Sequence, residues 1–355
     1  MSRPHVAIVA PSLDILGGQG VQAQALTEAL RGDGWPVEFV AVNPRFPRGL
    51  RWLRRRRGLR TVVNEALYLP SLARLRRADV VHVFSASYWS FLLAPVPAML
   101  AARAAGARVV LNYHSGEAED HLGRWGALVH PWLRLADAIV VPSAYLAGVF
   151  ARHGYRTRVV PNVVDLGRFR YRERRPLRPR LVSSRNLEPY YRVDTTLEAF
   201  ALLGAREPAA TLTIAGVGSL EPSLRSLAAA LGCRHARFVG RVEPAAMPRL
   251  YDEADVFVNA SVLDNQPVSI LEAFASGLPV VSTAAGAIGG LVRDGETGLV
   301  VPAGDPAAMA KAVTRLLEDG DFARALARRA HEEAAAFTWP RVRACWDAVY
   351  TEAAA

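Results

Sequence analysis

The sequence predicts an α/β fold of two doubly wound domains, and three observations support this prediction. The chain has 355 residues, which is enough for two domains of ordinary size. Strand-like apolar runs alternate with helix-like segments from end to end, a pattern typical of parallel sheets covered by helices. One stretch rich in Arg and Pro, residues 166–180, interrupts this alternation without apolar periodicity, as a linker does. We therefore predict an N-terminal domain at 1–165 and a C-terminal domain at 181–337.

Short apolar runs mark the expected strands of each domain. In the first domain these are residues 6–10, 37–42, 80–84, 109–113 and 138–142. In the second domain they are residues 180–183, 211–215, 237–239, 256–260, 279–282 and 299–301. Ligands of doubly wound folds lie outside the carboxyl ends of the strands. With two such domains facing each other, we expect the ligand in the cleft between them.

The composition and the first residues of the sequence narrow the class of protein. A hydrophobic content of 51% with 21% charged residues is typical of a globular chain. Cys233 and Cys345 form neither a metal-binding spacing nor a disulfide framework, so a reducing cytoplasm fits. Residues 1–13 lack a small-residue cleavage pattern, and no signal peptide is predicted. The longest apolar run, residues 88–102, contains two prolines and is too short to span a bilayer, so we expect a buried helix there.

The positive charge is concentrated in the first half of the chain. Of a net charge of +10, the first 165 residues contribute 20 arginines against 11 acidic residues, or +9. Seven arginines lie between Arg48 and Arg60, interrupted by Trp52 and Leu53. A basic, partly apolar patch suits anionic membrane lipids or an acidic acceptor. Nucleic acid is not expected, because no stacking motif accompanies the arginines. Since Lys311 is the only lysine, a genome that favours arginine codons is the alternative explanation.

The segment from Asp264 to Glu272 carries the strongest chemical signal. It indicates a loop that turns into a helix, with Pro267 at the first helical position, where no N–H is needed. The helix at 268–276 is apolar nearly all round and should be buried, which takes Glu272 into the interior. A buried carboxylate needs a donor, which ribose hydroxyls would supply, and the helix start offers N–H groups to a phosphate. A capped core helix with a satisfied Glu is the alternative.

Other candidate residues follow expected strands. Gly17 and Gly18 follow the first strand and open a helix, where glycines let a phosphate or an acceptor approach the backbone. His114 follows the strand at 109–113. Arg185 follows the strand at 180–183 and is able to pair with a phosphate. Taken singly, each of these residues also has a purely structural interpretation.

Together these motifs resemble the retaining glycosyltransferases of family 4, a group that includes phosphatidylinositol mannosyltransferases. The resemblance extends from His5 to about Trp346. The family's two acidic residues, separated by seven positions, are matched by Asp264 and Glu272. The other matches are, in chain order, Gly17-Gly18, His114, Pro161-Asn162-Val163-Val164-Asp165, Gly216-Val217-Gly218 and Asp294-Gly295-Glu296-Thr297-Gly298-Leu299.

The resemblance implies a GT-B fold, in which two Rossmann-like domains face each other across a cleft, and a role for each matched residue. Glu272 is expected to hold the ribose of a nucleotide-sugar donor. The expected catalytic residues are Arg185, which holds the diphosphate, and Asp264 and His114, which lie against the donor sugar. The other expected donor-binding residues are Gly17, Gly18, Arg192, Gly216, Asn265, Gln266, Pro267 and Val268. No metal and no cofactor are expected, since the nucleotide-sugar is a substrate and the family uses helix ends and cations.

The resemblance also implies that the C-terminal helix, residues 338–355, returns to the first domain. Val342, Trp346, Val349 and Tyr350 have the required helical spacing. An ordinary terminal helix on the second domain is the alternative.

Two positions depart from the family pattern. Asp264 is one methylene shorter than the usual glutamate, and Tyr191 stands where the family usually has a lysine. Arg192 is adjacent and could replace that lysine, although arginine and lysine reach oxygens differently. The favoured function is transfer of a sugar to a lipid or cell-envelope glycan precursor, by a cytoplasmic protein that binds the inner face of the membrane peripherally. A non-catalytic nucleotide-sugar-binding homologue and a GT-B epimerase are the alternatives, and UDP, GDP and ADP donors all remain open.

Overall fold

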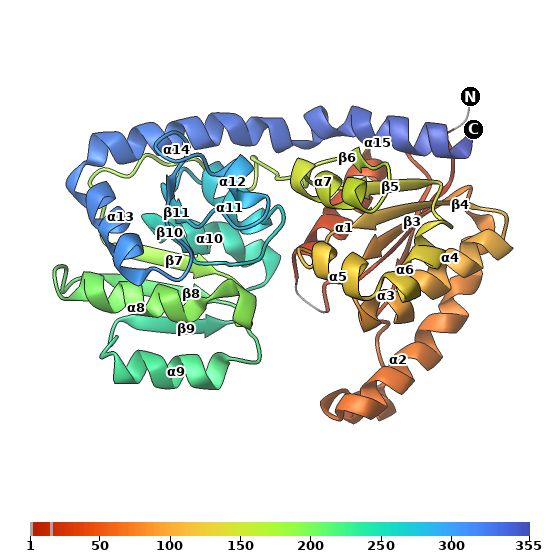
Figure 1. The fold of residues 1–355 in the computed structure, drawn as a ribbon, viewed down its shortest axis with the longest axis horizontal. Helices are drawn as coiled ribbons and strands as arrows, with labels where there is room; N and C mark the ends of the chain where they lie inside the picture. Colours follow the sequence, from red (N-terminus) through yellow and green to blue (C-terminus); the bar gives the residue numbers. More distant parts are fainter. Residues whose placement is uncertain (1–2, 15–16) are drawn as a thin grey trace. The chain divides into compact units, whose positions relative to one another are not determined.

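The computed structural model describes residues 3–14 and 17–355, apart from the side chains of Arg51, Arg54, Arg55 and Arg57. These four arginines of the basic cluster therefore lie outside the described side chains. The chain forms two compact units, one of Met1–Pro161 with Val342–Ala355, the other of Asn162–Arg341. Each unit contains one six-stranded sheet flanked by helices (Figure 1). All strand pairs that the structure describes in the two sheets are parallel, as the alternation of strands and helices predicts.

The first unit has the sheet order β2-β1-β3-β4-β5-β6. Its strands are β1 (Val6–Ala10), β2 (Val37–Ala41), β3 (Val80–Ser85), β4 (Arg108–Tyr113), β5 (Ala138–Val141) and β6 (Arg158–Val159). β1 lies between β2 and β3, with Val6 opposite both Val37 and Val80. The apolar pattern does not predict β6, because both of its residues are exposed at the sheet edge.

Helices connect these strands and bury one apolar face each. In chain order they are α1 (Gly18–Gly32), η1 (Arg48–Arg55), α2 (Arg57–Ser71), η2 (Leu72–Arg77), α3 (Trp89–Leu93), α4 (Pro95–Ala104), α5 (Ala118–Arg124), α6 (Gly126–Leu133) and α7 (Ala144–Arg152). In α1, Ala23, Leu26 and Leu30 are buried at the spacing of one helical face. α7 is capped by Ser143, whose hydroxyl accepts a hydrogen bond from the amide of Leu146 at 3.3 Å.

The apolar run at 88–102 differs from its prediction as one buried helix. It forms two helices, α3 and α4, with the break at Ala94. Pro95 begins the second helix because it cannot donate an amide hydrogen bond to a preceding turn. Trp89, Leu93 and Leu100 are exposed, so the run is only partly buried.

The C-terminal helix α15 (Trp339–Ala354) belongs to the first unit from Val342 onward. The Tyr350 hydroxyl lies 2.7 Å from Nδ1 of His82, a buried residue in the middle of β3. The Trp346 ring packs on the same histidine with a centroid separation of 4.8 Å. Aromatic packing and one buried hydrogen bond therefore hold α15 on the first sheet.

The second unit has the sheet order β12-β11-β10-β7-β8-β9. Its strands are β7 (Arg180–Ser184), β8 (Thr211–Ala215), β9 (Ala236–Gly240), β10 (Val256–Asn259), β11 (Val280–Ser282) and β12 (Leu299–Val300). Alternate residues of the central strands enter different cores: Leu181 and Val258 lie in one, Val182 and Phe257 in the other. Burial on both faces explains why these strands are continuous apolar runs in the sequence.

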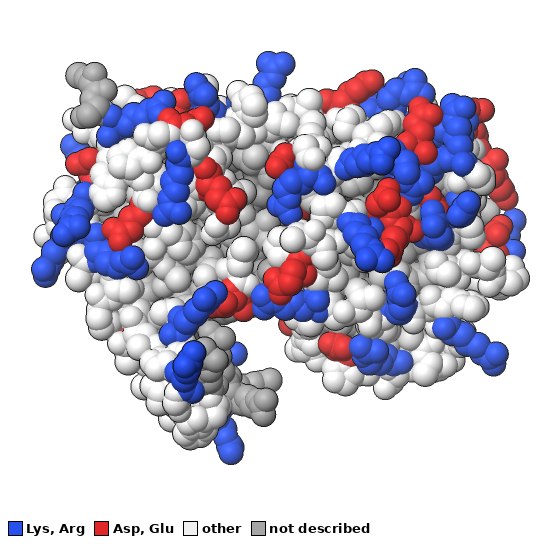
Figure 2. Space-filling view, turned by 180° about the vertical axis from the view of Figure 1, so that it is seen from behind, with Lys and Arg blue, Asp and Glu red and all other residues white. Residues whose placement is uncertain are grey.

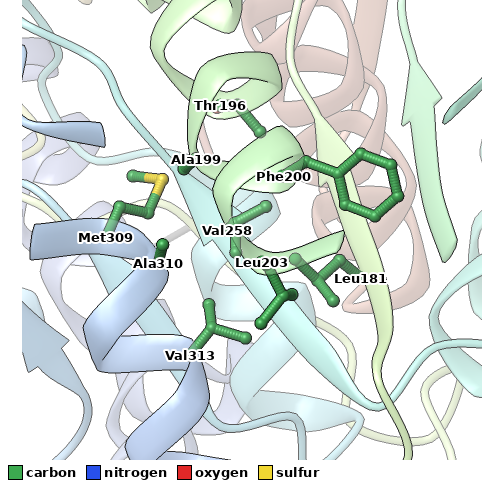
Figure 3. Close-up of a pocket in the computed structure, with 9 residues that line it drawn as sticks. All are labelled: Leu181, Thr196, Ala199, Phe200, Leu203, Val258, Met309, Ala310 and Val313. Carbon is green, nitrogen blue, oxygen red and sulfur yellow. The ribbon is translucent and has the colours of Figure 1, made fainter. Parts of the chain in front are cut away.

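The helices of the second unit cover both faces of this sheet. They are η3 (Pro189–Tyr191), α8 (Val193–Gly204), α9 (Glu221–Ala230), η4 (Pro244–Ala246), α10 (Met247–Asp252), α11 (Val268–Ala275), α12 (Ile288–Leu291), α13 (Pro306–Glu318), α14 (Gly320–Ala334) and η5 (Ala335–Phe337). Side chains of α8 and α13 meet over β7 and β10 around a small crevice (Figure 3). Apart from the Thr196 side chain, its lining is entirely hydrocarbon or thioether, so it is part of the core rather than a polar binding site.

The segment 166–180, expected as a linker, packs within the second unit. The buried Arg174 donates hydrogen bonds to the carbonyl oxygens of Tyr251, Ala254 and Ser276. Arg172 pairs with Asp252 at 2.9 Å. No helix in the described parts of the chain, 3–14 and 17–355, is long and apolar enough to cross a membrane.

Candidate active site

The carboxyl ends of β7 and β10 form the topological switch point of the second unit. β7 is followed along the chain by β8 on one side, whereas β10 lies on its other side. Connections therefore leave these two neighbouring strands in opposite directions, which opens a crevice where doubly wound folds bind ligands. Arg185 directly follows β7, and Ser261 and Asp264 follow β10.

Arg185 is the buried cation of this switch point. Its side chain is only 8% exposed and forms an ion pair with the carboxylate of Asp264. Nη1 donates to the Ser269 hydroxyl at 2.9 Å, and Nη2 donates to the Ser261 hydroxyl at 3.4 Å. Desolvation by burial lowers the pKa of Arg185 from its ordinary value. A guanidinium held by one carboxylate and two hydroxyls is fixed in place before any ligand arrives.

The ring of Tyr191 packs against the guanidinium of Arg185. The guanidinium carbon of Arg185 lies 4.3 Å from the centroid of the Tyr191 ring, a cation–π geometry. Tyr191 also packs against Tyr190 and against the apolar core beneath α8. The position where the family usually has a lysine therefore holds an aromatic ring that stacks on the remaining cation.

Asn265 and Gln266 follow Asp264 in a loop tied by hydrogen bonds. The Asp264 carboxylate accepts from the amide of Asn265 at 2.9 Å. The side-chain oxygen of Gln266 accepts from the amide of Asn162 at 2.5 Å, and its carbonyl accepts from the Asn162 side chain at 2.8 Å. The Pro-Asn segment at 161–165 thus helps to fix the loop before α11.

Pro267 is the N-cap of α11 in the structure, one position before its predicted place. Its ψ of 118° is extended, and its carbonyl accepts from the amide of Ile270 at 3.1 Å. Helix α11 therefore starts at Val268, and its first amides have no partner within the helix. These amides carry the positive end of the helix dipole at the switch point.

Glu272 lies one and a half turns inside α11. The Tyr251 hydroxyl donates to its Oε2 atom at 2.8 Å and lies 2.8 Å from the Ser184 hydroxyl at the end of β7. Desolvation by burial raises the pKa of Glu272 to about 7, although the hydrogen bond from Tyr251 acts in the opposite direction. Near neutral pH this carboxyl therefore exists in both protonation states.

The Gly216-Val217-Gly218 turn packs directly against the residues around Arg185. Gly216 has a φ of 155°, and a Cβ atom there would overlap the carbonyl oxygen of Arg185. A Cβ atom on Gly218 would overlap the carbonyl group of Leu187. Both positions need glycine because the two backbones approach so closely.

The side chain of Arg192 contacts Asp194 rather than Arg185. Its guanidinium pairs with Asp194, with Nε 3.0 Å from Oδ1 and Nη2 3.0 Å from Oδ2. Arg192 itself has a left-handed backbone, with a φ of 46°, and caps α8. The arginine expected to replace the missing lysine is thus engaged at the start of α8.

The first unit has its own switch point, between β1 and β3. Gly17, the N-cap of α1, is extended, and a Cβ atom there would have no atom of the described residues, 3–14 and 17–355, within 4 Å. The Gln19 side chain and the backbone amide of His114 both donate to the carbonyl of Ser85, the last residue of β3, at 3.1 and 3.2 Å. The glycine turn and the histidine are therefore held at the same strand end.

His114 is neutral in this environment. Desolvation by burial lowers its pKa to about 4. Its ring stacks on Phe84 with a centroid separation of 5.1 Å. A neutral imidazole has one donor and one acceptor nitrogen, which suits hydrogen bonding to a hydroxyl.

The sequence did not reveal Tyr251, Ser261 or Ser269 as parts of the site. Ser269 occupies the second position of α11, where a hydroxyl facing the preceding loop is a usable signal. Ser261 follows β10 directly, as Arg185 follows β7. Tyr251 lies on α10, away in sequence from every motif, and only the tertiary structure brings it to Glu272.

Two family models cover most of the chain. The model described as Glycosyltransferase Family 4 matches residues 16–168, and the model described as Glycosyl transferases group 1 matches residues 178–319. Glycogen synthase of Mycobacterium tuberculosis is 31% identical over 294 residues, which are 78% of this chain and 69% of that protein. The chain belongs to glycosyltransferase family 4. Its enzyme class is accordingly that of the glycosyltransferases.

Another relative and two solved structures are also similar to this family 4 glycosyltransferase. D-inositol 3-phosphate glycosyltransferase of Geodermatophilus obscurus is 35% identical over 242 residues, and the match covers 62% of this chain and about half (53%) of that protein. Sucrose-phosphate synthase of Thermosynechococcus elongatus has a similar structure, with a TM-score of 0.75, 20% identity and 99% of both chains covered. Anabaena HepE, solved with UDP-glucose, has a TM-score of 0.75 at 17% identity, covering 98% of this chain and 100% of that one. These structures confirm the predicted GT-B fold.

The family 4 glycosyltransferase has no group of three or more His, Cys, Asp or Glu able to hold a metal ion among residues 3–14 and 17–355. The charged groups described at the switch point of the second unit are Arg185, Asp264 and Glu272.

Proposed function

We propose that this glycosyltransferase transfers a sugar from a nucleotide-sugar donor to an acceptor, with retention at the anomeric carbon. The observation that carries the proposal is the buried, pre-positioned guanidinium of Arg185 beside the first amides of α11. Transfer from a nucleotide-sugar releases a diphosphate, whose developing negative charge must be stabilised by cations and amides. Arg185 and the start of α11 supply both at one strand end.

In this mechanism the donor diphosphate replaces Asp264 as the ion-pair partner of Arg185. Arginine pairs with phosphate oxygens through two parallel N–H groups, and such pairs are stronger than neutral hydrogen bonds. Asp264 is then released to accept hydrogen bonds from the donor sugar. The Gly216 turn leaves no room for a side chain beside Arg185, so its backbone stays close to the diphosphate.

Glu272 binds the ribose. Its carboxylate accepts hydrogen bonds from the two ribose hydroxyls, in addition to the hydrogen bond from Tyr251. Each hydroxyl hydrogen bond lowers the free energy of the charged carboxylate, which burial alone disfavours. Binding of the donor therefore draws Glu272 toward its ionised form at neutral pH.

In the first unit, His114 and the Gly17-Gly18 turn act on the reacting side of the donor. A neutral His114 offers one hydrogen-bond donor and one acceptor to sugar hydroxyls without adding charge next to an oxocarbenium-like carbon. The open space at Gly17 and Gly18 lets a phosphate or an acceptor approach the start of α1.

Ligands of similar structures support this choice of donor class. HepE has been solved with UDP and with UDP-glucose, and pneumococcal GtfA with UDP and GlcNAc. We therefore test uridine donors first and include GDP- and ADP-sugars, because the residues described here do not select a base.

The test is calorimetric titration with UDP-, GDP- and ADP-sugars, followed by an assay for slow hydrolysis of the tightest donor without acceptor. We expect one donor to bind, with binding lost in Glu272→Ala and hydrolysis lost in Arg185→Ala. No binding by any donor would overturn the donor-site assignment. Binding without hydrolysis or transfer would favour a non-catalytic homologue, which the tyrosine at position 191 makes the second candidate. Conversion of the donor to an epimer would favour the epimerase.

We also propose that the acceptor is a lipid or a cell-envelope glycan precursor met at an anionic membrane. The arm of η1 and α2 projects from the body of the first unit (Figure 1) and carries basic side chains (Figure 2). Along α2, Leu59, Val62 and Leu69 are 52%, 66% and 48% exposed at positions of one helical face. Trp52 on η1 is also exposed. Exposed apolar residues beside arginines suit insertion into an anionic bilayer surface.

Vesicle sedimentation tests this second proposal. We expect binding to phosphatidylglycerol vesicles but not to phosphatidylcholine vesicles, weakened about tenfold or more by the pair Leu59→Asp and Val62→Asp, since charged groups oppose insertion. Leu202→Asp is the matched control, because Leu202 is equally exposed on α8 of the other unit. Equal binding to both lipids, or equal loss with the control variant, would contradict the proposal.

A further inference from the structure

The ends of β3 and β4 carry an aromatic group that donor chemistry does not use. Tyr88 and Trp89 lie three and four residues after the end of β3, and Trp125 lies between α5 and α6. The Trp89 ring packs edge-on against Trp125, with centroids 5.3 Å apart and planes at 89°, and Tyr88 packs on Trp125 at 5.5 Å. We call these three residues the tryptophan platform. Trp89 is nevertheless 65% exposed, although burial would stabilise so large an apolar ring.

The platform is held by a strained residue. Tyr88 has a φ of 56° and a ψ of −132°, a conformation that residues other than glycine rarely adopt. Its hydroxyl donates to Oδ2 of Asp120 at 2.7 Å, and Asp120 pairs with Arg124 at 2.8 Å. The strain therefore persists because the ring and hydroxyl of Tyr88 are both fixed, and it leaves the next residue, Trp89, at the surface.

A buried hydrogen-bonded chain supports the platform from inside. The Tyr113 hydroxyl lies 2.9 Å from the Ser87 hydroxyl and 2.8 Å from Nδ1 of His121. His121 is fully buried, packs edge-on against Tyr88, and has no recorded partner for Nε2 among the described residues. Burial lowers the pKa of His121 to about 4, so the chain is neutral. The platform is rigid because it lies at strand ends, because Tyr88 is fixed in a strained conformation, and because these hydrogen-bonded side chains lie behind it.

An exposed indole, in a ring cluster with a tyrosine whose hydroxyl donates to Asp120, matches the chemistry of a sugar ring. One face of a pyranose presents C–H groups that pack on an aromatic ring, while its edge presents hydroxyls that donate to carboxylates such as Asp120 and Glu117. The carboxyl groups that act on Tyr88 belong to Glu117 and Asp120, and Asp120 also pairs with Arg124. Burial raises the pKa of Glu117, with Asp120 contributing.

We propose that the tryptophan platform is a subsite for a sugar ring of the acceptor, stacked on Trp89 with hydroxyls directed to Asp120. The inference rests on the proposed function, since an acceptor is meaningful only if transfer occurs. Its location supports it: His114 follows β4, and its amide is hydrogen-bonded to Ser85 at the end of β3, so platform and histidine share two strand ends. The acceptor thus carries at least one sugar beside its lipid or glycan remainder.

Saturation-transfer NMR on the full chain tests the subsite directly, with methyl α-D-glucoside, maltose and octyl β-D-glucoside as probes. We expect saturation of pyranose ring protons by the wild-type protein, about tenfold weaker binding in Trp89→Ala, and intermediate binding in Trp89→Phe and Asp120→Asn. Trp52→Ala is the matched control, because that tryptophan is equally exposed on the arm. Saturation of octyl-chain protons alone, no saturation, or unchanged binding in Trp89→Ala would overturn the subsite.

A parallel assay separates failure of the subsite from failure of the proposed function. Acceptor-free hydrolysis of the donor should be the same in the wild-type protein and Trp89→Ala, since Trp89 is not part of the donor site. Loss of hydrolysis in Trp89→Ala, with its folding unchanged by circular dichroism, would overturn a separate acceptor subsite. Absence of hydrolysis in the wild-type protein would count against the proposed function, while the NMR binding result would still decide the subsite.

Discussion

Each unit of this glycosyltransferase has a switch point beside its first strand, but the two switch points are filled in opposite ways. In the second unit, Gly216 packs closely against the backbone of Arg185, and one carboxylate and two hydroxyls hold the buried guanidinium. In the first unit, none of the residues that the structure describes would contact a Cβ atom on Gly17, and the neighbouring His114 is neutral. Glycine thus serves close packing in one unit and access in the other.

Because of this difference, the two units suit different kinds of ligand. The second unit holds charges in a fixed arrangement, which suits a ligand that is itself charged, such as a diphosphate. The first unit offers open backbone, neutral histidines and aromatic rings, which suit a neutral polyhydroxyl ligand. Four predictions test whether the ionic switch point is as tightly built, and the open one as tolerant, as this comparison requires.

The largest effect is expected from Arg185→Ala. It removes the partner of a buried carboxylate, and breaking such a pair destabilises by about 3–5 kcal/mol. Urea denaturation should show this loss, and adding Asp264→Asn should restore most of the stability because no buried charge is left unpaired. Donor hydrolysis should stay lost in both variants. Full stability of the single variant would show that the pair is not buried in solution.

Glu272→Gln should change the pH dependence of stability. The folded chain keeps the Glu272 proton up to about pH 7, whereas the unfolded chain releases it near 4.5. The folded state therefore binds more protons in this window, and the free energy of unfolding falls as pH rises through it. The total fall attributable to Glu272 is about 3 kcal/mol.

Glutamine has no such proton, so this part of the slope should vanish while the hydrogen bond from Tyr251 is kept. Unfolding measured from pH 4 to 8 checks it. The control, Glu332→Gln on the exposed face of α14, should retain the wild-type slope. An unchanged slope in Glu272→Gln would mean that the carboxyl is solvated.

Gly216→Ala contrasts directly with Gly17→Ala. A methyl group at Gly216 overlaps the carbonyl of Arg185, and overpacking of this kind costs about 1–3 kcal/mol. At Gly17 the backbone is extended and the space is open, so thermal unfolding should shift little. Equal destabilisation by the two substitutions would remove the contrast between the two glycine turns.

The smallest effect is expected from Tyr191→Ala. It removes a ring 4.3 Å below the guanidinium of Arg185, and cation–π contacts are worth about 0.5–2 kcal/mol. Donor affinity measured by calorimetry should fall several-fold, with Tyr191→Phe near the wild-type value because the ring remains. A strong gain on Tyr191→Lys would indicate instead that the tyrosine replaces a needed second cation.

Much of the fold could be predicted because its signals are local. The run at 6–10 coincides with β1, since a strand buried on both faces is apolar throughout. The run at 211–215 coincides with β8, in which Leu212, Ile214 and Ala215 are buried. The run at 88–102 misled because apolar content alone does not distinguish one buried helix from two helices that leave Trp89 and Leu100 exposed. Pro95 was the local signal for the break.

At the candidate site, the residues next to strand ends were predictable, and their partners were not. Arg185, Asp264 and Glu272 stand in recognisable motifs, and the structure brings them to one switch point. Tyr251, which donates to Glu272, and Asp194, which pairs with Arg192, have no signal in the sequence that links them to the site.

The sequence by itself determined the alternation of strands and helices, the place of the glycine turns and the acidic pair of α11, because each depends on neighbouring residues. Only the tertiary structure decided which side chains are charged and which are fixed by hydrogen bonds or ion pairs. The pKa of Glu272, the pairing of Arg185 with Asp264, and the strain at Tyr88 depend on burial and on contacts between segments far apart in the chain. Apolar runs indicate which segments are buried, but the partners that a buried polar group meets are a property of the packed molecule.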